Sequence, residues 1–244
     1  LEGGISFHGV YDLSDTLQLC SKGGTLSGED LLAVAETLAG ARRLRRQIDN
    51  QELRPKLTAL LVDLATLPNL ERTLKFGLEE GGRVADRAST KLFELRRKAQ
   101  NLRLQRQDLL RELLRRYASI VQDTVITERN GRPVVAVKSA AGAQLPGVVH
   151  DSSASGSTIF IEPQSVIPLS NRLAVLETSI RVEEQKLLSD WSALVGENEQ
   201  SISYLCEVLL QLDLALARAR YGKFIEGRPP TLLEEVDAPF QLNG

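Results

Sequence analysis

Cysteine, methionine and aromatic residues are scarce in this chain of 244 residues. It has two cysteines, no methionine and one tryptophan, and aromatic residues make up 5% of it. Cys20 and Cys206 are too few for a disulfide framework and lack the spacing of metal ligands, so we expect no metal site and a reducing, cytoplasmic setting. No signal peptide is recognisable, and no apolar run approaches the roughly 18 residues that a transmembrane helix needs, so we expect no membrane partner.

A large excess of either charge is also lacking, but the charges are unevenly distributed. The net charge of −2 restricts any affinity for nucleic acid to local surfaces. Residues 83–116 contain eleven Lys and Arg against four Asp and Glu, whereas residues 171–200 contain three basic and six acidic side chains. The two segments complement each other, although an exposed ion pair contributes only about 0–1 kcal/mol. The basic run is typical of a solvated helix face, or of a surface that also attracts phosphate.

The same two segments carry apolar residues at spacings of three and four, which is typical of two helices packed side by side. The outgoing stripe skips a position that Arg106 fills, and the returning stripe skips one that Glu183 fills. We predict an antiparallel two-helix arm about 50 Å long. If Leu113 lies level with Leu173, Arg106 contacts Glu183 within the seam. The stripe positions are Leu92, Leu95, Ala99, Leu102, Leu109 and Leu113, then Val166, Leu169, Leu173, Leu176, Ile180, Leu187 and Leu194.

Between these segments lies a run of short, strand-like stretches. Val125-Ile126 and residues 134–137 are rich in β-branched side chains, and Asn130-Gly131 between them is the strongest two-residue signal for a hairpin turn. We predict a small antiparallel β tip at the end of the arm. The predicted fold class is therefore mainly α, a helical core with a long antiparallel two-helix arm carrying a β tip.

The rest of the chain predicts a helical core in two parts. Ser27, with Asp30 three residues later, predicts the start of a helix, and Pro55 and Pro68 divide the following stretch into short helices. The chain opens in a Gly-rich segment without Met, so we expect a fragment of a longer protein. We divide it into a connector (1–28), the core (29–85 and 198–226), an outgoing helix (86–122), the tip (123–163), a returning helix (164–197) and a linker (227–244).

Polar side chains of the tip form the candidate site. Arg129, Asn130 and Arg132 surround the predicted turn and are placed to contact phosphates, and Lys138 lies at the far end of its strand. Ser153 and Ser155 belong to a loop whose hydroxyl groups can donate to phosphate oxygens without reading base sequence. A solvated turn and an ordinary connecting loop also explain these residues.

His150 and Asp151 suggest catalysis or a metal site, but the rest of the chain does not support either. His8 is the only other histidine, so ligands for a metal are missing. The residues before Ser155 do not form a nucleophile elbow, so we expect no catalytic residues. We expect His150 and Asp151 to hydrogen-bond across the tip, toward loop 152–157. The expected structural residues of the tip also include Gly131, Gly156, Glu162 and Pro163.

A specific combination of motifs spans residues 125–171. It consists of ITERNGR at 126–132, VVAVK at 134–138, PGVVHD at 146–151, the serine-rich loop, TIFIEP at 158–163 and Asn171. This combination resembles the clamp of the MutS family of DNA-binding ATPases, and most closely its type-two bacterial branch, which lacks the mismatch-reading domain. Residues 213–221 (DLALARARY) look like the family's last core helix before the ATPase.

The resemblance implies the core, lever and clamp region of a dimeric ATPase, with levers that connect the ATPase to clamps closing around nucleic acid. It implies ATP, Mg²⁺ and a homodimer for the full-length protein. It also implies work on branched or recombining DNA, in repair and suppression of recombination, or on stalled ribosomes. The chain has no G-x-x-x-x-G-K-[ST] phosphate loop and no nuclease module. We therefore expect a fragment that binds but neither hydrolyses ATP nor cuts, and that can be monomeric alone.

Two hypotheses for the function follow. In the first, the tip contacts branched or duplex DNA, or a ribosome, and binding weakens steeply with salt because phosphates are neutralised. In the second, the arm is a structural coiled coil whose tip contacts protein, such as its dimer mate. Replacing Arg129 and Arg132 by Ala distinguishes them, because only the first predicts weaker binding to all nucleic-acid sequences alike.

Overall fold

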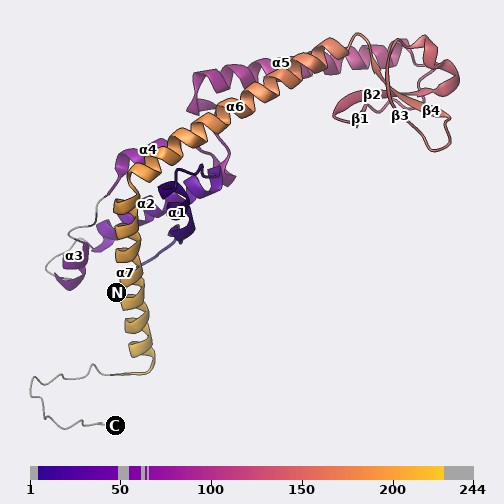
Figure 1. Cartoon of the computed structure of the whole chain (residues 1–244). Coiled ribbons are helices and arrows are strands. Elements are labelled where there is room, and N and C mark those ends of the chain that lie inside the picture. Colours follow the sequence, from indigo (N-terminus) through magenta and orange to yellow (C-terminus); the bar gives the residue numbers. More distant parts are fainter. Residues whose placement is uncertain (1–4, 49–54, 62–63, 65, 228–244) are drawn as a thin grey trace, which may run out of the picture.

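Figure 1 shows a helical body from which two long helices carry a small sheet away. This computed structural model describes residues 5–48, 55–61, 64 and 66–227, and the following account concerns these. The mainly helical fold class with an antiparallel arm and a β tip is confirmed. Most of the predicted linker, and parts of the predicted connector and of the helix expected after Pro55, lie outside the described residues. Within the described part, no helix combines the length and apolar character needed to cross a membrane.

The body contains α1 (Ser14–Ser21), α2 (Gly28–Ile48), α3 (Pro55–Leu61), α4 (Pro68–Gly77) and α7 (Glu199–Phe224). The start of α2 follows from a reciprocal cap: the Ser27 hydroxyl accepts from the Asp30 amide at 3.1 Å, and the Asp30 carboxylate accepts from the Ser27 amide at 3.2 Å. Helices before and after the arm share one core, as their apolar faces predicted. Its most deeply buried members include Leu31, Val34, Leu44, Ile48, Leu74, Ile202 and Leu205.

The arm consists of α5 (Thr90–Arg116) and α6 (Ile167–Glu197), which pack side by side in opposite directions (Figure 1). Two 3₁₀ turns, η1 (Glu80–Gly82) and η2 (Asp86–Ala88), precede it. The helix α5 is about 40 Å long, shorter than predicted. It ends early because the following residues turn back to the sheet, where Val121 forms a bridge with Val137.

The register of the arm differs from the prediction, and the expected contact between Arg106 and Glu183 is wrong. Glu183 accepts from Lys91 at 2.8 Å and from Ser89 at 2.9 Å, at the base of α5. Further out, Arg103 pairs with Glu177 at 2.7 Å. The leucine stripes specify which faces meet but not their offset, which the tip determines because Leu113 packs in one cluster with Val166.

Burial along the arm follows the predicted stripes for most positions. Leu92, Ala99, Leu113 and Leu173 are buried. Leu194 departs from the stripe and is 37% exposed, because Trp191 and Val195 take the core-facing positions of that turn. The half-buried positions of the stripes are Leu95, Leu102, Arg106, Leu109, Leu169, Leu176, Ile180 and Leu187.

The tip is a four-stranded antiparallel sheet in the order β1-β2-β4-β3. Its strands are β1 (Thr127–Arg129), β2 (Arg132–Lys138), β3 (Gly147–Ser152) and β4 (Thr158–Pro163), with a 3₁₀ turn, η3 (Ser139–Gln144), after β2. A second apolar cluster ties the sheet to the end of the arm, so the tip has a core separate from that of the body. This cluster contains Leu110, Leu113, Ile120, Val135, Val137, Leu145, Ile161 and Val166.

Candidate nucleic-acid interface

The turn between β1 and β2 forms as the Asn-Gly pair predicts. Asn130 has a φ of 51° and Gly131 a φ of 73°, while Arg129 and Arg132 face each other as the last strand pair. Two successive positive φ angles are those of the hairpin turn whose twist matches the flanking strands. The turn is exposed.

Arg129 lies across the sheet instead of extending into solvent. Its guanidinium lies 4.4 Å from the ring centroid of Phe160 on β4, and its Nε donates to Asp151 on β3 at 3.1 Å. The side chains of Arg129 and Asp151 remain 38% and 50% exposed. A phosphate can therefore reach this arginine, but it must compete with the carboxylate of Asp151.

Arg132 belongs to a second network, centred on the buried carboxylate of Glu162. One Nη of Arg132 donates to Asn171 on α6 at 2.8 Å and lies 3.6 Å from Glu162 Oε1. The Nε2 of His150 lies 3.0 Å from Glu162 Oε2. Glu162 is only 3% exposed, so it depends on these partners for its solvation.

Strand alternation explains why these polar groups share one face. Val135 and Val137 of β2 and Ile161 of β4 point into the apolar cluster, so the intervening positions, among them Arg132 and Glu162, face the other way. A bulge between Val149 and Asp151 in β3 adds one residue there, and this residue is His150. His150 thus bonds to Glu162. Asp151 accepts from Arg129 and also, as expected, from the loop 152–157, through the Ser152 amide at 2.8 Å.

The serine loop lies at the other end of β2. Gly156 has a φ of 69°, the Ser153 hydroxyl accepts from the Thr158 amide at 3.1 Å, and the hydroxyls of Ser155 and Ser157 are 2.8 Å apart. Lys138 is exposed nearby, its Nζ donating to the Ser119 carbonyl at 3.4 Å.

The predicted site residues therefore form two groups. Arg129, Asn130 and Arg132 lie at the start of β2, whereas Lys138, Ser153 and Ser155 lie at its end. Six residue steps of a strand separate the two groups, about 20 Å. A single phosphate cannot touch both, but a nucleic-acid strand can.

Two further cations adjoin the second group and were not singled out from the sequence. Arg115 and Arg116 are exposed at the end of α5, three or four residues before Ser119, which Lys138 contacts. Arg116 donates to Glu112 at 2.6 Å, while Arg115 has no acidic partner within the described part of the chain. The only sequence signal was the basic run as a whole, which does not show which cations the returning helix neutralises.

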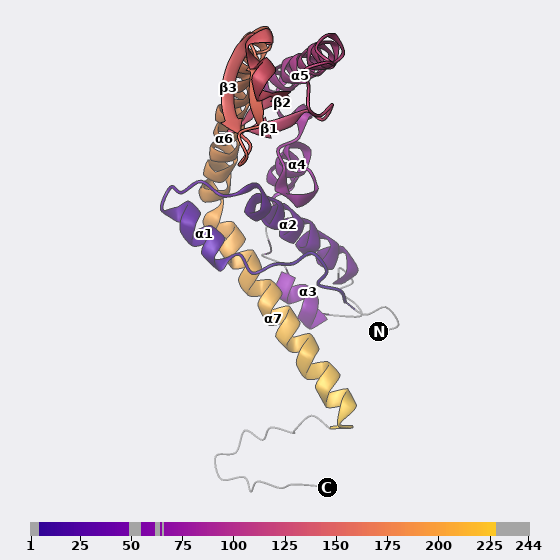
Figure 2. The same ribbon diagram turned by 90° about the vertical axis from the view of Figure 1, so that its right-hand side faces the viewer.

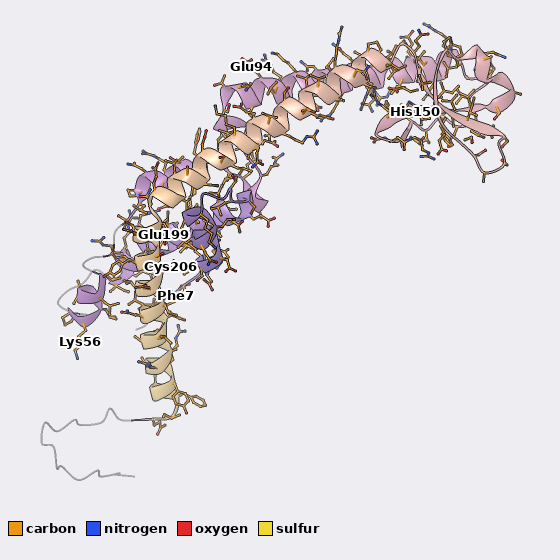
Figure 3. The ribbon with its side chains drawn as sticks, viewed as in Figure 1. Phe7, Lys56, Glu94, His150, Glu199 and Cys206 are labelled. Carbon is orange, nitrogen blue, oxygen red and sulfur yellow. The ribbon has the colours of Figure 1, made fainter. Side chains whose placement is uncertain are left out.

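Among the described residues, the reactive side chains are divided between the tip and the body. His150 lies in the tip, far from Glu199 and Cys206 in the body (Figure 3). Among those residues, no three His, Cys, Asp or Glu side chains are placed to hold a metal ion. Burial raises the pKa of the Cys206 thiol to about 11, which makes it a poor nucleophile.

No protein-family model matches the chain. It is 39% identical to the Endonuclease MutS2 of Synechocystis sp., over 97% of this chain and 29% of that protein. It is 38% identical to the Endonuclease MutS2 of Pelotomaculum thermopropionicum, over 93% of this chain and 29% of that protein. A protein of the same name from Symbiobacterium thermophilum is 38% identical, over 96% of this chain and 30% of its own length. The chain thus spans less than a third of the length of these curated relatives.

Proposed function

Since this chain belongs to the MutS2 branch of the MutS family, we propose that it is the part of such a protein that grips nucleic acid, with α5 and α6 as the lever and the tip as the clamp. The observation that carries this proposal is the position of three exposed cations. Arg115, Arg116 and Lys138, here called the cationic edge, lie at the far end of the arm: the two arginines end α5, and Lys138 adjoins the serine loop and contacts Ser119.

Some cations of the arm pair with acidic side chains, and others are available to bind phosphate. Lys91, Arg96 and Arg103 on α5 are neutralised by Glu183, Glu184 and Glu177 on α6. The cations at the far end of α5 have no such partners on α6 within the described residues. Arg111 and Arg116 pair instead with Asp108 and Glu112 of α5 itself, so the positive charge without an acidic partner among the described residues lies at Arg115 and Lys138, where it attracts phosphate.

Arg129 and Arg132 have a different role in this proposal. Both are engaged with Asp151 and Glu162, so they shape the tip and add less free charge than the cationic edge. Asn130 and Gly131 present an exposed turn beside them, so the first group offers backbone and amide donors to a phosphate. Neither group offers a built pocket for a base, which favours binding that ignores sequence.

For the longer protein we propose a DNA-directed function, because relatives carry the name endonuclease. ATP with Mg²⁺, any cleavage and the homodimer would belong to parts that this chain does not contain. Branched DNA, duplex DNA and ribosomal RNA share the phosphate backbone that the cationic edge recognises. A binding panel of the three distinguishes them.

The test compares two charge-matched variants of this chain by fluorescence anisotropy at several salt concentrations. Replacing Arg115, Arg116 and Lys138 by Ala should weaken binding at least tenfold and flatten the dependence of log K on log salt by about 0.9 per lost phosphate contact. Replacing Lys22, Arg46 and Lys56, exposed cations of the body, by Ala should change neither. Equal affinity of both variants would refute the tip as the binding surface.

One observation favours a contact with protein as a second function. The edge strand β3 has one free edge, and its Val148 and Val149 are 49% and 54% exposed. Exposed edge strands accept an added strand from another chain. Replacing Val148 by Lys should abolish such pairing and leave nucleic-acid binding unchanged, which a pull-down with proteins of the same cell and the anisotropy assay measure separately.

A further inference from the structure

The two long sides of the arm differ. On one side, Arg96 and Arg103 of α5 pair with Glu184 and Glu177 of α6, so ion pairs bridge the two helices there. On the other side lies an open groove of about 620 Å³, which we call the arm groove. It is lined by residues of α5 and α6 alone, and by none of those four. Figures 1 and 2 show the body at one end of the arm and the tip at the other, so the arm groove lies between them.

The surface of the arm groove is mostly apolar. Leu102 and Leu176 are half-buried at its base, where the stripes of the two helices meet, and Val175 on its wall is 67% exposed. Asn101 and Gln105 of α5 add exposed amide groups along the opposite wall. A groove of this kind between two packed helices accepts the apolar face of a further amphipathic helix.

The wall formed by α6 has the spacing of a second helix seam. One face of α6 carries side chains at successive steps of three, four, three and four residues: Arg172, Val175, Ser179, Val182 and Lys186. This face is separate from the stripe that packs on α5. Val182 is 62% exposed, nearly as much as Val175, and between them the Ser179 hydroxyl donates to the Val175 carbonyl at 3.0 Å. Two stripes of this spacing on one helix are typical of a helix with two helical neighbours.

The rim of the arm groove is positively charged. Among the described residues that line it, Lys98 and Arg172 are cations and none is acidic. The Lys98 ammonium has an acidic partner only at 4.0 Å, in Glu94, and Arg172 forms no ion pair within the described ranges of the chain. Lys186 adds a third exposed cation at the body end of the α6 stripe. An occupant with acidic side chains beside its apolar face therefore complements this rim.

We propose that the arm groove docks an acidic amphipathic helix of a partner protein, as the third helix of the arm. Its apolar residues would lie against Leu102, Val175 and Val182, and its carboxylates would face Lys98 and Arg172. The α6 stripe from residue 172 to residue 186 is about 21 Å long, so the docked helix needs about four turns.

Nucleic acid fits the arm groove less well than a helix does, because the apolar base offers nothing to phosphates or sugars. Arg115 of the cationic edge lies ten residues beyond Gln105 on α5, about 15 Å away along the helix. A docked helix therefore leaves the cationic edge free. The inference concerns a different surface and does not rest on the proposed function.

Fluorescence anisotropy of the 244-residue chain with labelled peptides tests the proposal. The probe is a designed helix of about 18 residues, with leucines at steps of three and four and glutamates on both flanks. A second peptide has lysine at every glutamate position. The glutamate peptide should bind saturably with a dissociation constant below roughly 100 μM, and the lysine peptide about tenfold more weakly or worse.

Substitutions place the binding in the arm groove. Val175→Asp should weaken binding of the glutamate peptide about tenfold or more, because it puts a charge on the apolar wall. Leu104→Asp is the matched control, since Leu104 is 50% exposed on α5 but does not line the arm groove. Both side chains are exposed, so circular dichroism of both variants should match the parent chain. The variant without the cationic edge should bind the peptide as the parent does.

A charge exchange tests the recognition itself. Lys98→Glu combined with Arg172→Glu should reverse the preference, so that the lysine peptide binds better than the glutamate peptide. Absence of saturable binding up to roughly 500 μM would overturn the proposal. So would equal binding of the two peptides by the parent chain, or indifference to Val175→Asp. Displacement of the peptide by duplex DNA, or self-association that Val175→Asp abolishes in sedimentation, would also overturn it and identify nucleic acid or a second copy as the occupant.

Discussion

Gly77, the last residue of α4, lies directly against the indole of Trp191 on α6. A Cβ atom at Gly77 would come within 2.3 Å of the Trp191 ring, which is itself 6% exposed. The contact joins the base of the arm to the body. Trp191 is the only tryptophan of the chain, and its large buried surface helps fix the direction in which the arm leaves the core.

Gly77→Ala should therefore loosen the root of the arm. The added methyl group has no space, and overpacking of this kind typically costs about 1–3 kcal/mol. Urea unfolding followed by tryptophan fluorescence measures this at the affected site. Gly222→Ala is the control, because nothing lies within 4 Å of a Cβ there and the substitution removes a helix glycine at a gain of about 0.5–1 kcal/mol. Equal midpoints for the two variants would contradict the contact.

The loss of stability of the fold at acid pH should depend on Glu183. Hydrogen bonds from Lys91 and Ser89 hold the pKa of this carboxyl below its ordinary value of 4.5. A carboxyl whose pKa is lowered by folding stabilises the fold above its ordinary pKa, and the contribution is lost as the pH falls through the lowered one. Glu183→Gln should thus lower the melting temperature at pH 7, and the gap to the parent chain should close toward pH 3.

Glu94→Gln is the matched control for that titration. Glu94 is an exposed carboxylate on the same arm, 4.0 Å from Lys98 one turn along α5. Its replacement should leave the melting temperature nearly unchanged at every pH, because exposed pairs contribute little. A gap for Glu183→Gln that stays constant down to pH 3 would show that the carboxylate charge is not what stabilises the arm.

The apolar spacing predicted the arm and the helices of the body, because these depend on the periodicity of one helix at a time. The antiparallel direction followed because the chain must return from the tip. The hairpin at Asn130-Gly131 was equally predictable, since the two residues favour the backbone angles that the turn needs. The register of the arm could not be predicted, because the same stripe allows Leu113 to face either Leu173 or Val166. The offset depends on the path of the chain through the tip, which no local sequence pattern predicts.

The candidate site likewise has features that the sequence predicts and features that it does not. Arg129 and Arg132 were read as free phosphate contacts because they flank an exposed turn. Their pairing with Asp151 and Glu162 depends on strand order, which brings residues 22 and 30 positions apart together. The bulge that admits His150 beside Glu162 is likewise invisible in a sequence of short strands.

Leu173→Ala should destabilise the arm more than a truncation at a half-buried position of the seam. Leu173 is 3% exposed, so its truncation should cost about 2–3 kcal/mol, the lower part of the range for buried leucines, on a two-helix arm with few neighbours to support a cavity. Leu109→Ala, at a half-buried position, should cost about 1 kcal/mol. Hydrogen exchange of arm amides measures both, and Leu194→Ala, on an exposed part of α6, should stay within about 0.5 kcal/mol of the parent.

The buried carboxylate of Glu162 makes Arg132 a structural residue of the tip. Arg132→Ala removes the guanidinium that lies 3.6 Å from that carboxylate, and leaving a buried charged group short of a partner costs at least about 1–3 kcal/mol. Hydrogen exchange should therefore speed up in β2 and β4 and stay unchanged in α2. Adding Glu162→Gln to Arg132→Ala should recover part of the loss, a coupling that a double-mutant cycle isolates.

Arg129→Ala is the comparison, because Asp151 is half exposed and needs no partner for its solvation. Were Arg132→Ala to weaken nucleic-acid binding with no change in exchange, Arg132 would be a phosphate contact and not a support of the sheet.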